Sequence, residues 1–278
     1  MTPKLPTLDT LHWVQPEIWL TLGMCAVLIV PMLFGRRNVT LITITAVTGL
    51  GLALIGAIAT VSGANQLLFS GSLAVDLFSQ FFKVLLIEFT LLVVLQWWLT
   101  NRGGVHAYDL PDFLCLLMGA TLGMSLMASA TNLLTLLIAT ETASFPSFAL
   151  AGFRKRTRLG SEGSIKYVVF GAAASAVSVY GMSLIYGATG SIDFGGIAAV
   201  ASGETGISPL LGVGLAALLA GIAFKLSAVP LHFWCPDVFQ GAPTEVTTFL
   251  SVASKGAAVA LLVRFLGFFG ATDGNFMG

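Results

Sequence analysis

The chain has 278 residues, of which 56% are hydrophobic and only 9% are charged, and its formal net charge is +0. Soluble domains carry about 25% charged residues, so this chain has too little charge to cover a surface exposed to water, and its mean hydropathy of +0.92 indicates an integral membrane protein. A neutral chain also has no electrostatic basis for binding nucleic acid. The cysteines are odd in number and follow no ligand spacing, so we expect no metal site.

A membrane-spanning helix needs about 20 mostly apolar residues. The sequence predicts eight such helices, at Ile18–Leu33, Val39–Val61, Val75–Leu99, Phe113–Ala128, Leu133–Phe153, Ser164–Tyr186, Leu210–Phe233 and Val246–Phe269. The first and fourth are short, and we expect their ends to extend into the adjoining loops. The longest polar connection runs from Gly187 to Pro209. The expected fold is therefore all-α, a polytopic transmembrane helix bundle.

The loops alternate in charge along the chain. Every second loop is basic. These loops carry Arg36, Arg37, Arg102, Arg154, Lys155, Arg156 and Arg158. The other set carries Asp193 and Glu204 and no basic residue, and the N-terminal tail has only Lys4. By the positive-inside rule we expect the basic loops to be cytoplasmic and both ends of the chain to face the other side.

Three ionisable residues lie near the middle of expected spans: Glu141, Lys225 and Lys255. Each is about ten residues, or roughly 15 Å, from a helix end. A charge at the bilayer centre costs about 2.5–3.5 kcal/mol on insertion scales, so these side chains must face the bundle interior, a partner charge or internal water. Burial disfavours a protonated lysine and a nearby carboxylate favours it. The pattern indicates a Glu–Lys pair that loads and releases a proton, and a purely structural ion pair is the alternative.

The seventh helix contains Pro230, five residues after Lys225. Proline removes a backbone donor and clashes with the carbonyl four residues earlier, here that of Leu226. Backbone groups freed inside a membrane must be satisfied by side chains or water, and broken helices beside a charge are typical of transporter ion sites. We therefore expect a broken seventh helix with a hydrated, polar spot beside Lys225. Pro146, five residues after Glu141, repeats the arrangement.

Other ionisable residues each have a structural alternative to a role in proton transfer. Asp76 and Lys83 share a helix face, which predicts structural pairing between them, and Glu88 on the same helix has no assigned role. Lys166 lies just inside the sixth helix and either belongs to a proton uptake path or anchors the helix at the interface. His232 is near the expected break and is either a proton relay or a structural histidine.

The segment Phe224–Thr244 reads FKLSAVPLHFWCPDVFQGAPT. It strongly resembles the subunit N family, one of the antiporter-like membrane subunits of proton-pumping NADH–quinone oxidoreductase (respiratory complex I). The resemblance continues at Ser251–Lys255, Ser164–Tyr167 and Ala139–Pro146, and it covers residues 112–269 well and the first three helices loosely. Sister subunits and sodium/proton antiporters share this outline, but the Ser-Ile-Lys-Tyr and Val-Phe-Gln-Gly-Ala-Pro sequences favour subunit N.

The resemblance implies a role for each candidate residue. Glu141 is similar to the family's helix-five glutamate, which pairs with and tunes the pumping lysine, and Lys225 is similar to that lysine on the broken helix seven. Lys255 resembles the helix-eight lysine that passes the proton toward the centre of the subunit, and Lys166 resembles the helix-six lysine. His232 falls where the family has a histidine at the helix break.

The resemblance also implies a place in an assembly. The chain would be a membrane subunit that takes part in proton translocation coupled to quinone reduction and holds no redox centre. NADH, quinone, flavin and iron–sulfur clusters would bind to other subunits. The expected partners are neighbouring antiporter-like and small membrane subunits, in a bacterial cytoplasmic (inner) membrane.

The chain departs from the family in length and at two positions. We expect N-terminal helices over residues 1–110 and the first five-helix repeat, a proton half-channel, over 111–278, with the second, inverted repeat absent. Glu245 and Cys235 occupy positions where the family is expected to have an uncharged residue and a residue other than cysteine. Two alternatives stay open: a subunit of a cation/proton antiporter or membrane-bound hydrogenase, and a structural scaffold whose buried charges only fix helix packing.

Overall fold

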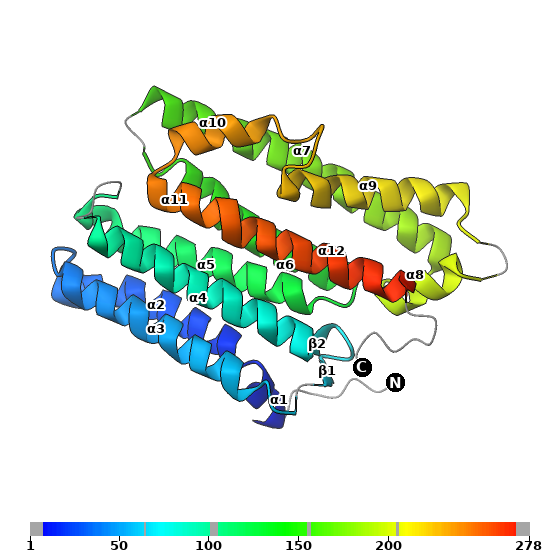
Figure 1. Cartoon of the computed structure of the whole chain (residues 1–278), viewed down its shortest axis with the longest axis horizontal. Coiled ribbons are helices and arrows are strands. Elements are labelled where there is room, and N and C mark those ends of the chain that lie inside the picture. The colour runs from blue at the N-terminus through cyan, green and yellow to red at the C-terminus, as the bar shows by residue number, and fades with distance from the viewer. Residues whose placement is uncertain (1–7, 64, 101–104, 155–156, 204–205, 271–278) are drawn as a thin grey trace.

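The computed structural model describes residues 8–63, 65–100, 105–154, 157–203 and 206–270. Long helices lie side by side along a common direction (Figure 1). Within the described residues, eight stretches are long and apolar enough to cross a membrane, as the sequence predicts. They are α2 (Gln15–Phe34), α3 (Val39–Ala59), α4 (Leu77–Leu99), α5 (Leu110–Ser129), α6 (Leu133–Ala151), α7 (Arg158–Thr189), α9 (Pro209–Leu226) and the combined stretch Thr244–Gly270. Lys4, Arg102, Lys155, Arg156 and Glu204 lie outside the described residues.

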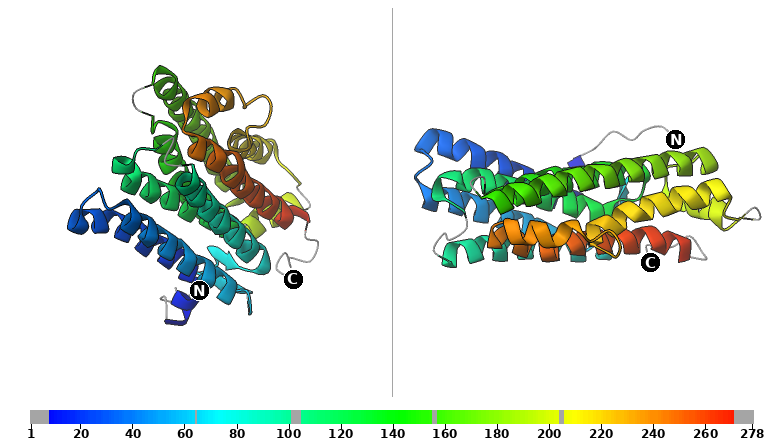
Figure 2. Two further views of the ribbon diagram at one scale, coloured as in Figure 1. Left: turned by 60° about the vertical axis from the view of Figure 1, so that its left-hand side comes forward. Right: turned by 90° about the horizontal axis from the view of Figure 1, so that it is seen from above.

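Several boundaries differ from the expected ones. The first and fourth spans extend at both ends, as predicted, and the sixth is also longer, so that α7 runs along most of the length of the molecule (Figure 2). The polar connection after α7 contains a short helix, α8 (Phe194–Ala201), which the sequence analysis did not predict. The eighth span consists of α11 (Thr244–Phe249), a π-helical turn (Leu250–Ser254) and α12 (Lys255–Gly270). The remaining elements are α1 (Leu8–Trp13), a 3₁₀ turn (Ala107–Asp109) and α10 (Trp234–Gly241).

A short hairpin precedes the third span, so α4 begins at Leu77 and not at Val75 as expected. Strand β1 (Gln66–Leu68) pairs antiparallel with β2 (Leu73–Val75). Asp76 then caps α4: its carboxylate accepts a hydrogen bond from the Ser79 amide at 2.7 Å, and the Ser79 hydroxyl accepts one from the Asp76 amide at 3.0 Å. This reciprocal cap satisfies amides that a helix start otherwise leaves free.

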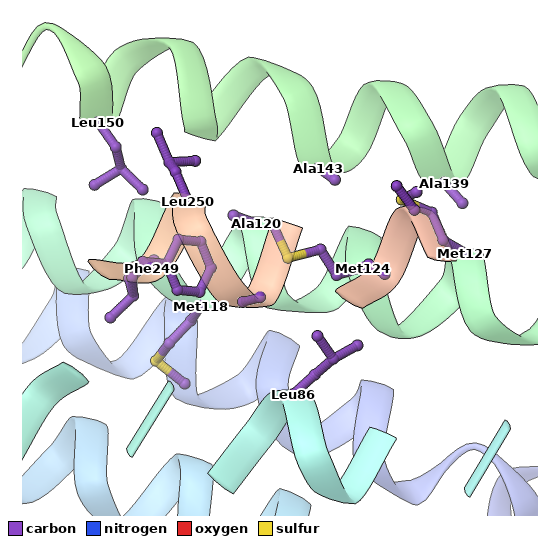
Figure 3. Packing of buried hydrophobic residues seen from close by; sticks show 14 of the residues in the cluster. Leu86, Met118, Ala120, Met124, Met127, Ala139, Ala143, Leu150, Phe249 and Leu250 are labelled. Carbon is purple, nitrogen blue, oxygen red and sulfur yellow. The ribbon is translucent and has the colours of Figure 1, made fainter. Parts of the chain in front are cut away.

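Helix α5 is the centre of the bundle. In its 18-residue apolar stretch, 72% of the residues are buried, a larger share than in any other span of the described residues. A Cβ atom at Gly123 would collide with the backbone of Ala143, so α5 and α6 approach more closely there than larger residues allow. Met118, Met124 and Met127 fill the space between α5 and its neighbours (Figure 3). The flexible methionine side chain suits such irregular gaps.

The two ends of the bundle differ in character. The α2–α3 and α6–α7 turns, with Arg36, Arg37 and Arg154, lie at one end, and the hairpin and α8 lie at the other (Figure 1). At the basic end the Arg36 guanidinium donates to the Asp112 carboxylate at 2.9 Å, with both side chains about 40% exposed. The alternation of charge among the loops thus corresponds to two opposite ends of one bundle.

The expected pairing of Asp76 with Lys83 is wrong. Arg264 on α12 donates two hydrogen bonds to the Asp76 carboxylate, of 2.9 and 2.7 Å, and a third to the Ala128 carbonyl at 2.7 Å. Lys83 instead binds Glu17 of α2 at 2.7 Å. The sequence prediction failed because Asp76 precedes α4 as its cap, and each side chain reaches a different neighbouring helix.

We expect the loss of the buried Asp76–Arg264 ion pair to destabilise the fold far more than the loss of the exposed Arg36–Asp112 pair. Arg264 is fully buried and the Asp76 side chain is 8% exposed. We expect Asp76→Asn to destabilise the fold by about 3–5 kcal/mol, because it leaves a buried guanidinium without a counter-charge. Thermal unfolding of the purified protein in detergent measures this change. The control is Asp112→Asn, which breaks the exposed pair with Arg36 and should cost about 0–1 kcal/mol; equal effects of the two substitutions would contradict the assignment.

Candidate functional site

Lys225 is the next-to-last residue of α9, at the point between α9 and α10, and both of these helices pack along α7 (Figure 1). It is 16 residues from Pro209 at the start of α9 (225 − 209) and 16 from Gly241 at the end of α10 (241 − 225). Its ammonium group donates to the Ser144 hydroxyl at 2.5 Å and to the Thr140 carbonyl at 3.3 Å, both on α6. The lysine is therefore held at depth by neutral oxygens of a neighbouring helix.

The chain stops being helical directly after Lys225. Helix α9 ends at Leu226, Ser227 adopts a left-handed conformation with φ 55°, and α10 begins only at Trp234. Pro230 lies inside this break. Lys255 reaches the end of α9 from α12, donating to the Leu226 carbonyl at 3.3 Å and to the Ser227 hydroxyl at 2.7 Å. A cation at a helix C-terminus is favourable because free carbonyls carry partial negative charge there.

Lys255 owes its position to an irregular helix. The π-helical turn Leu250–Ser254 comes immediately before it, and such turns insert an extra residue that shifts the side chains that follow. The Lys255 ammonium lies 6.0 Å from the Trp234 ring and 5.9 Å from the Phe239 ring, both on α10. These distances are within the range of cation–π attraction, so two aromatic faces, the Leu226 carbonyl and the Ser227 hydroxyl together hold the charge.

Glu141 shares a cavity with Lys225 but does not touch it. Its carboxylate accepts a hydrogen bond from the Ser175 hydroxyl of α7 at 2.7 Å, and the ion pairs within 4 Å among the described residues do not join it to Lys225. The cavity between them measures ≈ 40 Å³, and one water needs about 10–15 Å³ on this measure. Its polar lining consists of hydroxyls besides the two charges: Thr140, Ser144, Ser147, Tyr167, Ser175, Ser178 and Ser254. Water therefore fits between acid and base.

Pro146 does not break its helix as Pro230 does. Helix α6 runs from Leu133 to Ala151 with Pro146 inside it. The hydroxyls of Ser144 and Ser147 donate to carbonyls of the same helix, at 2.6 and 2.7 Å. These are the bonds to the carbonyl four residues back that serine commonly makes within a helix. The expected similarity of the two proline positions thus extends to sequence spacing but not to helix geometry.

Two of the predicted site residues lie apart from the cavity. Lys166 on α7 binds Asp237 of α10 at 2.6 Å and Glu162 at 2.8 Å, with its side chain 37% exposed. His232 lies in the break with its side chain exposed. The structure therefore brings together Glu141, Lys225 and, across the break, Lys255, and it leaves Lys166 and His232 outside the cavity lining.

The sequence did not predict the partners of these charges, most of which are neutral hydroxyls. Ser144, Ser175 and Ser227 each bind a candidate ionisable group, and Asp237 binds Lys166. The sequence shows serines near the intramembrane charges, but it does not show which helix faces meet. Glu245, the unexpected acid, is buried at the start of α11 and one of its oxygens has no partner among the described residues.

The described residues contain no group of three His, Cys, Asp or Glu side chains placed to hold a metal ion. The polar lining of the cavity consists of hydroxyls, a carboxylate and an ammonium group. These groups suit proton exchange through hydrogen bonds, since each can donate or accept a hydrogen bond with water.

Comparison with known proteins identifies relatives of this chain. The family described as "NADH:quinone oxidoreductase/Mrp antiporter, TM" matches residues 130–277. A NADH-quinone oxidoreductase subunit N from Sphingopyxis alaskensis is 40% identical over 253 residues, covering 91% of this chain and 52% of the relative. Another subunit N, from an Anaeromyxobacter species, is 39% identical over 269 residues, covering 91% and 50%. The chain thus spans about half the length of the curated relatives it matches.

Solved structures have the same fold. A chain of respiratory complex I from Thermus thermophilus with bound aureothin matches with a TM-score of 0.75 and 34% identity, over 90% of this chain and 52% of that one. The Mrp complex from a Dietzia species matches with a TM-score of 0.76 and 21% identity, over 95% and 50%, which shows the fold alone. The family match covers more than half of the chain, and the eight apolar helices of the described residues agree with it. The chain belongs to the NADH:quinone oxidoreductase/Mrp antiporter transmembrane family.

Proposed function

We propose that this chain is an antiporter-like membrane subunit of a proton-translocating NADH–quinone oxidoreductase. The observation that carries the proposal is the placement of Lys225: it lies at the end of α9, beside a water-sized cavity shared with Glu141 and next to a helix break closed by Lys255. Relatives named subunit N, at about 40% identity, support the choice of assembly.

The geometry suggests how a proton moves. Lys225 in its protonated form donates to Ser144 and to the Thr140 carbonyl, and Glu141 stabilises that positive charge through the cavity. Ser254, the neighbour of Lys255, also lines the cavity. Because like charges disfavour each other, a second proton arriving at one lysine favours release from the other. Proton transfer from Lys225 toward Lys255 passes, in this proposal, through the hydroxyls that line the cavity and the water it can hold.

The remaining assignments follow from the same proposal. Residues 111–278 form one proton half-channel and residues 1–110 form helices that support it. The basic end, where Lys166 meets Asp237 and Glu162, faces the cytoplasm of a bacterial cell as the uptake side. His232 serves at the break as a proton relay. Flavin, iron–sulfur clusters, NADH and quinone bind to other subunits, and no step on this chain uses them.

One other function has an observation in its favour. The matching family also includes Mrp antiporters, and the Mrp complex from Dietzia shares the fold. A cation/proton antiporter subunit would use the same Glu141–Lys225 arrangement with sodium movement in place of quinone chemistry. Proton movement that depends on sodium and continues without NADH oxidation would favour this second candidate.

The proposed assembly predicts co-migration on a native gel. After gentle solubilisation of membranes, we expect the chain to run with a very large assembly that stains for NADH oxidation. Migration alone, or with a smaller assembly that lacks this activity, would contradict the proposed complex and favour an antiporter.

Neutralising Lys225 tests the proton path. We expect Lys225→Met to leave assembly intact but to lower NADH-driven acidification of membrane vesicles by at least about tenfold, since removing a positioned proton-transfer group typically costs about 10²-fold or more. The control is Arg37→Met, a loss of positive charge on an exposed turn far from the cavity. Full coupling in the Lys225 variant would favour the scaffold interpretation.

Glu141→Gln tests the coupling between acid and base. The amide keeps the volume and the hydrogen bond from Ser175 but removes the negative charge that favours a protonated Lys225. We expect the pH profile of proton movement to shift to lower pH, measured with a pH-sensitive dye over a series of buffers. Glu141→Asp, which keeps the charge, should restore the original profile, and a Gln variant with the wild-type profile would refute the pair.

A further inference from the structure

Glu88 is placed where a membrane helix rarely carries a charge. It is the central residue of α4, 11 residues from Leu77 (88 − 77) and 11 from Leu99 (99 − 88). At 1.5 Å per residue that is roughly 16 Å from each end, close to the midplane of a hydrocarbon core about 30 Å thick. Its side chain is exposed on the outside of the bundle.

The surroundings of Glu88 are apolar. Leu77, Phe81, Leu92, Leu95 and Leu99 are 48–71% exposed, and their spacing of 4, 7 and 11 residues from Glu88 puts them on the same helix face. We call these six residues the Glu88 face. The carboxylate therefore lies at the centre of a stripe that is otherwise suited to lipid tails.

Glu88 differs from the other membrane-embedded charges of the chain. Lys83 and Arg264 have carboxylate partners, while Lys225, Lys255 and Glu141 bind hydroxyls or carbonyls. Within the described residues no hydrogen bond or ion pair is made by Glu88. An ionised group facing lipid at this depth is energetically unfavourable, and such groups are normally paired.

A groove lies beside the Glu88 face, between α3 and α4. Its volume is ≈ 570 Å³, and it is lined mostly by apolar side chains: Thr40, Thr43, Ile44, Val47 and Thr48 on α3, and Leu91, Leu92, Val94, Leu95 and Trp98 on α4. The two helices lie next to each other on the same side of the bundle (Figure 1). An apolar groove of this kind gives the side chains of a further helix a surface for van der Waals packing, which drives helix association in a membrane.

We propose that the Glu88 face is a docking surface for one transmembrane helix of a neighbouring subunit, and that this helix carries a lysine or arginine at mid-depth that pairs with Glu88. A second copy of this chain does not fit: contact about a two-fold axis through the face would set Glu88 against Glu88. The inference rests on the proposed function only in requiring that the chain assembles with other membrane subunits.

The test is crosslinking in intact membranes. A photoreactive amino acid replaces Leu92 on the Glu88 face or, as matched control, Ile29 on α2; both side chains are 52% exposed. We expect position 92 to give an adduct with a helix of one other subunit, identified by mass spectrometry as carrying a lysine or arginine near its middle. Position 29 should not give that adduct. The same substitution at Phe81 serves if the chain altered at position 92 fails to accumulate.

Charge variants complete the test. Glu88→Lys should abolish the position-92 adduct and Glu88→Gln should reduce it, and reversing the partner's basic residue to glutamate should restore it in the Glu88→Lys chain. Adducts with lipid alone, with a second copy of this chain, or with a helix that lacks a mid-depth basic residue would each overturn the proposal. An adduct with a basic helix from an assembly without NADH oxidation would refute the proposed function and leave the docking surface standing.

Discussion

The structure depends on one constraint of the bilayer: nothing in the hydrocarbon satisfies a free backbone group or a charge. Pro230 prevents α9 from continuing past the midplane, and the end of α9 leaves the Leu226 carbonyl free. Lys255 donates to that carbonyl from another helix. The break therefore stabilises Lys255 at a depth where a lysine is otherwise unfavourable, and Lys255 stabilises the break. The break begins two residues after Lys225, and Lys255 contacts Leu226 and Ser227 there, so helix disruption and buried charge coincide.

The buried charges are of two kinds. Asp76 with Arg264 and Glu17 with Lys83 are direct ion pairs that connect α4 to α12 and to α2. Removing a proton from either pair leaves an uncompensated charge, so these contacts are suited to holding helices together. Lys225 and Glu141, in contrast, bind serine hydroxyls across a water-sized cavity. A hydroxyl can donate or accept, so the site can change its protonation without losing all of its hydrogen bonds.

Helix α5 is the central helix against which the helices that make these contacts pack. It is the most buried span in the described residues, and its glycines and methionines fit closely against α2 and α6. Ordinary lipid-facing positions cover much of the periphery, so the exposed apolar residues there need no partner. Glu88 is the exception on that periphery, because a carboxylate at mid-depth is unfavourable against lipid. The same constraint that shapes the interior thus also applies to the outer surface, and it identifies the one face that requires a covering helix.

The spans, their order and the ionisable residues within them follow from the local sequence. Runs of about 20 apolar residues specify membrane helices because length and hydropathy are local properties, and Lys225 with Pro230 marked the broken helix by chemistry alone. Only the tertiary structure decided which groups meet. It paired Asp76 with Arg264, which is 188 residues away, and joined Glu141 to Ser175 of α7. It also placed Lys166 and His232 outside the cavity and Glu88 on the outer face. Those outcomes depend on helix rotation and packing, which set the direction of each side chain and are not encoded in local periodicity.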